Sequence, residues 1–84
     1  MKGILMQLLI LGTGCAKCNT LAQLTEQAAN ELGLDYELNK VTDLKQIMAL
    51  GVMMTPALAV NGSVKVVGKV PNVAELKTIL QQTA

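Results

Sequence analysis

Hydrophobic residues are almost continuous in the first segment of the chain and periodic in the segments that follow. Residues 4–11 are aliphatic apart from Gln7, which is typical of a strand buried on both faces in the middle of a sheet. Residues 16–32 predict a helix, because apolar side chains recur there at helical spacing. These apolar positions are Leu21, Leu24, Ala28 and Leu32. Gly33 stands where a C-cap glycine would end the helix.

The middle of the chain predicts a second strand and a short helix. Residues 34–39 alternate between apolar and polar side chains, the pattern of a strand with one solvent-facing side. A short helix should follow, capped by Thr42 or Asp43 and ended by Gly51. The apolar positions of this helix are Leu44, Ile47 and Met48.

The pattern after residue 56 predicts a β-hairpin. Residues 57–60 form one apolar run, and Asn61-Gly62 is the dipeptide preferred in a type I′ turn. Residues 64–67 then form the return strand, where Lys65 suits an exposed sheet edge.

The chain should close with a helix, and the order of elements then predicts an α/β fold. Asn72 with Glu75 three residues later forms a capping-box pattern that opens a helix through residues 76–80. The order β-α-β-α-β-β-α implies a right-handed parallel crossover followed by a hairpin. We expect a four-stranded mixed sheet with helices on both faces, the first strand being central and the second and fourth lying at the edges. Residues 1–84 should form a single domain.

Composition excludes several classes of function. The chain is 51% hydrophobic and 15% charged, which excludes disorder. Its net charge is +1, its seven basic residues are dispersed lysines and Tyr36 is its one aromatic residue, so nucleic-acid binding is not expected. The apolar run after Lys2 is too short for a membrane span and does not fit a secretion signal. We therefore expect a cytoplasmic monomer with no membrane association.

Cys15 and Cys18 are the only cysteines of a chain that has no histidine. Two thiols at this spacing can form a redox-active disulfide, hold a soft ion such as copper(I), or simply belong to the core. One chain cannot supply the four ligands of a structural zinc site. The pair follows the small-residue turn Gly12-Thr13-Gly14, beyond the carboxyl end of the expected central strand, where α/β sheets place their chemistry. The redox and metal interpretations both remain open on the cysteines alone.

A redox interpretation gives each cysteine a distinct role. The positive end of a helix dipole lowers a thiol pKa from about 8.5 into the range of roughly 3.5 to 7.5. Cys15, at the N-terminal end, would be the attacking nucleophile, with Lys17 adding a nearby positive charge. Cys18, one turn further on and partly covered, would resolve the mixed disulfide.

Further residues strengthen the redox interpretation through a family resemblance. The CxxC motif, the Thr55-Pro56 pair that opens the third strand, the Asn-Gly hairpin and Gly68 together resemble the thioredoxin and glutaredoxin superfamily, in its glutaredoxin-sized branch. The resemblance implies a thioredoxin fold and a thiol–disulfide oxidoreductase with no cofactor other than its Cys15–Cys18 disulfide. Its partners would be disulfide-containing proteins or small molecules and a reductase that donates electrons.

The resemblance also assigns residues outside the cysteine pair. Pro56 matches the cis-proline that lies beside the disulfide and keeps metal ions out, and Thr55 matches the residue whose backbone pairs with a bound substrate. Met53, Met54, Val70 and Pro71 are candidates for an apolar rim of the substrate groove, although ordinary core packing is the expected role for most of them. Gly14, Ala16 and Lys17 depart from the Trp and Gly-Pro of thioredoxin and the Pro-Tyr of glutaredoxin, so they are expected to tune the site.

Overall fold

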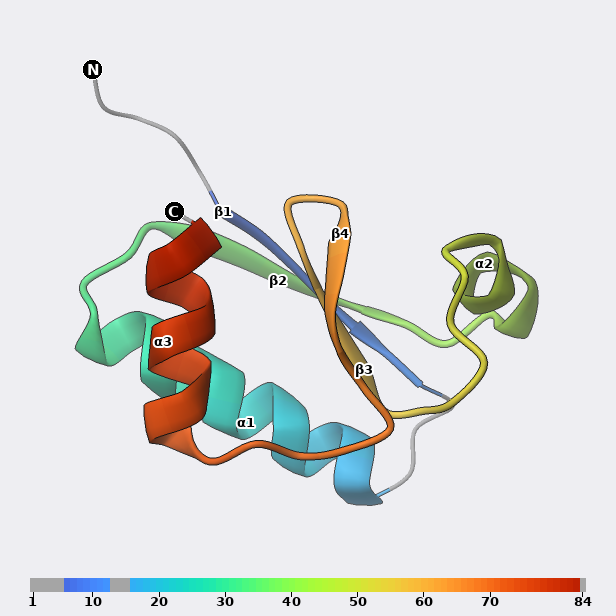
Figure 1. The fold of residues 1–84 in the computed structure, drawn as a ribbon, viewed down its shortest axis with the longest axis horizontal. Coiled ribbons are helices and arrows are strands. Elements are labelled where there is room, and N and C mark those ends of the chain that lie inside the picture. Colours follow the sequence, from blue (N-terminus) through green and yellow to red (C-terminus); the bar gives the residue numbers. More distant parts are fainter. Residues whose placement is uncertain (1–5, 13–15, 84) are drawn as a thin grey trace.

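The structure is a computed structural model that describes residues 6–12 and 16–83. In this part of the chain, seven helices and strands follow one another in the order β-α-β-α-β-β-α (Figure 1). The strands are β1 (Met6–Leu11), β2 (Tyr36–Val41), β3 (Ala57–Val60) and β4 (Ser63–Val67). The helices are α1 (Ala16–Glu31), α2 (Leu44–Ala49) and α3 (Val73–Thr83). The predicted order of elements is confirmed.

The strands form one mixed sheet in the order β2-β1-β3-β4. β1 is parallel to β2 and antiparallel to β3, and β3 is antiparallel to β4 with a bulge between Leu58 and Ala59. The apolar β1 therefore lies inside the sheet, while the half-polar β2 and the Lys65-bearing β4 form its edges, as predicted. This α/β arrangement is a thioredoxin fold.

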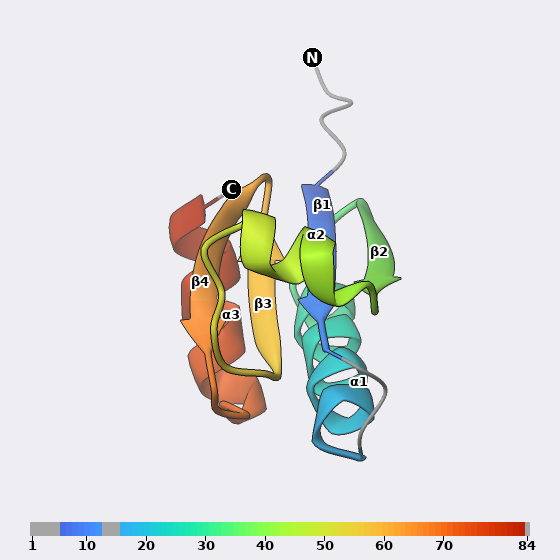
Figure 2. The same cartoon turned by 90° about the vertical axis from the view of Figure 1, so that its right-hand side faces the viewer.

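Helices cover both faces of the sheet, but unequally. α1 and α3 pack against each other and against one face, where the larger apolar core lies. α2 lies on the opposite face, which Figure 2 shows towards the viewer. The buried residues on the α2 side are Leu11, Ile47, Val52, Ala57 and Ala59.

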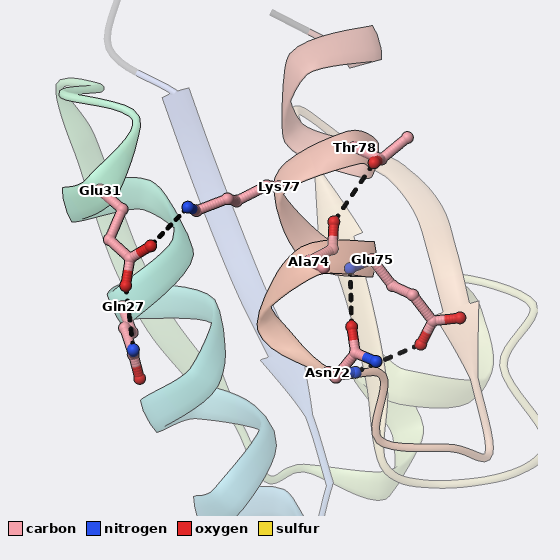
Figure 3. Close-up of polar contacts among 7 residues, drawn as sticks. All are labelled: Gln27, Glu31, Asn72, Ala74, Glu75, Lys77 and Thr78. Atoms are coloured by element: carbon pink, nitrogen blue, oxygen red, sulfur yellow. Dashed lines mark hydrogen bonds and ion pairs between the residues drawn. The ribbon is translucent and has the colours of Figure 1, made fainter.

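Polar contacts join α1 to α3 and cap α3 (Figure 3). Lys77 forms an ion pair with Glu31, which also accepts a hydrogen bond of 2.9 Å from Gln27 Nε2. At the start of α3, Asn72 Oδ1 accepts from the N–H of Glu75 over 2.8 Å, and Glu75 Oε1 accepts from the N–H of Asn72 over 3.2 Å. The predicted capping box is confirmed.

The predicted turn is confirmed. Only some of the predicted apolar positions of α1 and α2 are fully buried. Asn61 and Gly62 have φ values of 52° and 87°, which a type I′ turn requires. Of the three apolar positions of α2, only Ile47 is buried, whereas Leu44 and Met48 are each 58% exposed.

The buried face of α1 is made of smaller side chains than its leucine spacing suggests. Ala22, Thr25 and Ala29 are buried beside the predicted Leu21 and Ala28. The predicted core positions Leu24 and Leu32 are only partly buried, at the margin of the core. Small residues allow α1 to lie close to both the sheet and α3. No helix in the described residues is long and apolar enough to cross a membrane.

Candidate active site

The carboxyl ends of β1 and β2 lie beside the start of β3, at the same end of the sheet. Leu11 pairs with Val41 on β2 and with Ala57 on β3. One residue further, the N–H of Gly12 donates a hydrogen bond of 3.0 Å to the carbonyl oxygen of Val41. Pro56 lies one residue before Ala57, so the antiparallel register brings Gly12 and Pro56 to neighbouring positions.

Cys18 lies in the first turn of α1, and its side chain points towards this end of the sheet. It is buried, with 4% of its surface exposed. A Cβ at position 12 would overlap Cys18 Sγ and would lie 3.2 Å from Cys18 Cβ. The thiol therefore sits directly against the backbone of Gly12.

The loop before β3 forms the other side of the site. The peptide bond between Thr55 and Pro56 is cis, as the family resemblance implies. Thr55 Cβ lies 3.8 Å from the position that a Cβ of residue 12 would take, so Thr55 and Cys18 flank the same glycine. Pro56 is buried and Thr55 is exposed. The fold thus brings together Cys18, Thr55 and Pro56, which are far apart along the chain.

The remaining residues expected at the site fall into two groups. Ala16 and Lys17 are exposed in the first turn of α1. Gly14 and Cys15 lie outside the described residues. Among the described residues, no group of three or more cysteine or acidic side chains is placed to hold a metal ion.

Of the four residues of the expected apolar rim, only the two methionines are open to solvent. Met53 is 89% exposed and Met54 is 62% exposed, and they are the two residues before Thr55. Pro71 is buried and Val70 packs against the core, so neither offers an open apolar surface. A pocket of about 180 Å³ continues from Thr55 towards α2; its lining residues are Leu44, Ile47, Met48, Val52, Met53 and Thr55.

Two residues near the site were not singled out from the sequence. Gly12 was seen only as part of a small-residue turn, since no local pattern reveals a contact with Cys18. Lys40 donates through Nζ to Asn19 Oδ1 over 3.3 Å and so brings a positive charge next to α1. The predicted strand ended at residue 39, whereas β2 continues to Val41.

Comparisons with known proteins agree with this arrangement. A family model described as a thioredoxin domain matches residues 6–81. The chain is 41% identical over 76 residues to a thioredoxin of Methanothermobacter thermautotrophicus, covering 90% of this chain and 99% of that relative. It is 40% identical over 81 residues to a thioredoxin of Methanocaldococcus jannaschii, covering 96% of this chain and 93% of that relative. The chain therefore belongs to the thioredoxin family and is a thiol–disulfide oxidoreductase.

Proposed function

We propose that Cys15 and Cys18 are the redox-active pair of this enzyme and exchange electrons with disulfides of proteins or small molecules. The observation that carries the proposal is the position of the Cys18 thiol, which is buried against Gly12 and flanked by the Thr55-Pro56 loop. A buried thiol at this point is shielded from bulk reagents, and the CxxC spacing would let it attack a sulfur bonded to Cys15.

The exchange has two steps. The Cys15 thiolate attacks one sulfur of the substrate disulfide, forming a Cys15–substrate mixed disulfide and releasing the other substrate sulfur as a thiolate, which takes up a proton. The Cys18 thiol loses its proton and attacks Cys15 Sγ, which forms the Cys15–Cys18 disulfide and releases the second substrate sulfur as a thiol. Two electrons pass from the pair to the substrate. A reductase that supplies a dithiol or an equivalent two-electron donor then restores the pair.

Substrate would bind along the loop that precedes β3. The exposed Thr55 offers its backbone to an extended segment, as the resemblance implies, and Met53 and Met54 offer adaptable apolar contacts. Gly14, Ala16 and Lys17 would tune the reactivity of Cys15 through the shape and charge of the loop. No cofactor takes part, because the disulfide itself carries the electrons.

We place the enzyme in the cytoplasm as a monomer that acts on disulfide-containing proteins or small molecules. A reducible cysteine pair with no other cysteine in the chain suits a compartment that keeps thiols reduced.

A trapping experiment with oxidised glutathione tests the assignment of the two cysteines. Cys18→Ala should accumulate a stable mixed disulfide of Cys15 with glutathione, because the resolving thiol is missing. Cys15→Ala should accumulate far less, since Cys18 is buried. Intact-mass measurement of the quenched protein distinguishes the species, and the wild type should instead form the intramolecular disulfide.

Two results would overturn the proposal. If Cys15→Ala traps glutathione as readily as Cys18→Ala, the roles are reversed or shared. If the wild type forms no intramolecular disulfide at any ratio of reduced to oxidised glutathione, the pair is not redox-active. Stoichiometric copper(I) binding in that case would favour the alternative of a soft-metal carrier.

A further inference from the structure

We infer that Gly12 is a positioning residue for the reaction: the space that its missing side chain leaves is the space that Cys18 Sγ occupies. The inference rests on the proposed role of Cys18 as the resolving thiol. It goes beyond that role by naming what holds the thiol in place.

Gly12 is needed for its size and not for its backbone conformation. Its φ lies outside the left-handed region that is adopted by Gly33, Gly51, Gly62 and Gly68. An alanine could therefore take the same backbone conformation without strain. The obstacle is the overlap of its Cβ with Cys18 Sγ, together with the separation of only 3.2 Å from Cys18 Cβ.

The backbone on either side of the contact is held firmly. The N–H of Gly12 donates to Val41, and the preceding Leu11 is fully buried and paired with two strands. On α1, Cys18 is followed by Leu21 and Ala22, which are both buried in the core. Neither segment can retreat without disturbing this packing, so an added methyl group would be accommodated mainly by rotation of the Cys18 side chain.

Rotation of Cys18 affects the dithiol and the disulfide differently. A thiol that is not bonded to Cys15 can turn to another rotamer to escape the methyl group. A sulfur bonded to Cys15 cannot, because a disulfide requires a dihedral angle near 90° and a narrow range of Cβ separations, about 3.5 to 4.5 Å. Gly12→Ala should therefore destabilise the disulfide more than the dithiol.

The first measurement is the equilibrium of the Cys15–Cys18 pair with a series of reduced and oxidised glutathione. We expect Gly12→Ala to lower the equilibrium constant for disulfide formation at least tenfold, equivalent to a shift of about 30 mV towards a more oxidising potential. We also expect the mixed disulfide with glutathione to persist longer than in the wild type. A purely structural effect of the substitution would lower stability without moving this potential.

The second measurement is a double-mutant cycle on unfolding of the reduced protein, with Gly12→Ala, Cys18→Ala and the double variant. Cys18→Ala removes the sulfur and so relieves the overlap. Gly12→Ala should raise the unfolding equilibrium constant at least tenfold when Cys18 is present and less than threefold when it is replaced. If the single variant does not fold, rescue by Cys18→Ala supports the inference, and failure of the rescue overturns it.

The outcomes separate this inference from the proposed function. If Gly12→Ala leaves both the glutathione equilibrium and the unfolding constant within twofold of the wild type, Gly12 does not position Cys18, although the pair remains redox-active. If the wild type forms no Cys15–Cys18 disulfide, the proposed function fails, whereas the unfolding cycle still reports whether Gly12 makes room for the sulfur.

Discussion

The N–H of Gly68 donates a hydrogen bond of 2.8 Å to the carbonyl oxygen of Pro56. This bond extends the β3–β4 pairing one residue beyond Ala57 and Val67. Gly68 has a φ of 73°, and a Cβ there would lie 3.2 Å from Met54 Cε and 3.3 Å from Met54 Cβ. The loop that carries Thr55 is thus held at the end of β4 by the Gly68–Pro56 hydrogen bond and by packing of the Met54 side chain against Gly68.

Gly68→Ala should weaken both stability and catalysis. A left-handed conformation costs an alanine about 1–2 kcal/mol, and its methyl group would also push against Met54. We expect a lower free energy of unfolding in urea and slower reduction of oxidised glutathione by the reduced protein. Gly33→Ala is the matched control, because its φ is 69° and no atom lies within 4 Å of the added Cβ. Equal rates in the two variants would show that the Met54 contact does not position the loop.

Glu31 and Lys77 give the fold a pH-dependent link between α1 and α3 (Figure 3). The hydrogen bonds from Lys77 and then from Gln27 hold the pKa of Glu31 below its ordinary value of 4.5. Because the pKa is lower in the folded state, the link contributes its full stabilisation above pH 4.5 and loses it as the pH falls through the lowered value. Glu31→Gln should therefore be less stable than the wild type at neutral pH, with a difference that disappears in acid.

Thermal unfolding from neutral pH into acid checks this expectation. Glu26→Gln removes the same charge from the same helix, and Glu26 forms no ion pair with the rest of the described chain, so it serves as the control. The interpretation would be wrong if the difference between Glu31→Gln and the wild type stayed constant on acidification, or if both variants behaved alike.

The reciprocal cap of Asn72 and Glu75 should stabilise α3 as a unit. Asn72→Ala removes the acceptor for the N–H of Glu75 and should cost about 1 kcal/mol, within a range of roughly 0.5–2 kcal/mol. Glu75→Ala should cost less, because its hydrogen bond is longer. In urea unfolding, the double variant should lose less free energy of unfolding than the sum of the losses in the two single variants. Strict additivity would mean that the two hydrogen bonds form independently.

Lys17 should lower the pKa of the neighbouring Cys15 thiol. Replacing it with glutamate reverses a charge two residues from Cys15 in the sequence, which should raise the pH midpoint of iodoacetamide alkylation. The effect should shrink at high salt, since exposed charges are screened. Lys45→Glu makes the same charge change at another exposed position on α2 and should leave the midpoint unchanged. A shift of the same size in both variants would instead indicate a general effect of net charge.

Local patterns predicted the parts of this fold that depend on neighbouring residues. Three such features are determined by residues that are close together in the sequence: the aliphatic run of β1, the Asn61-Gly62 turn and the Asn72–Glu75 cap. The edge position of β4 followed from Lys65 for the same reason. Such features need no knowledge of what lies across the core.

Features that depend on distant contacts could not be predicted in this way. Thr25 is fully buried because it lies on the core-facing side of α1. Its hydroxyl donates a hydrogen bond of 2.7 Å to the carbonyl oxygen of Leu21. Leu44 and Met48 have helical spacing but remain largely exposed, and they line a pocket beside Met53 and Thr55. The contact of Gly12 with Cys18 joins two segments across a turn, so no periodicity reveals it.

The uneven covering of the sheet leads us to expect that α2 opens more easily than α1. Ile47 is its one buried side chain, so detaching α2 would expose only the smaller cluster of Leu11, Ile47, Val52, Ala57 and Ala59, whereas detaching α1 would expose Leu21, Ala28 and much of the larger core. We expect the backbone amides of α2 to exchange with deuterium by sub-global opening, well before those of α1. The connector from α2 leads directly to Thr55, so we expect each such opening to loosen the loop that carries Thr55 while the sheet and the Cys18 thiol stay in place.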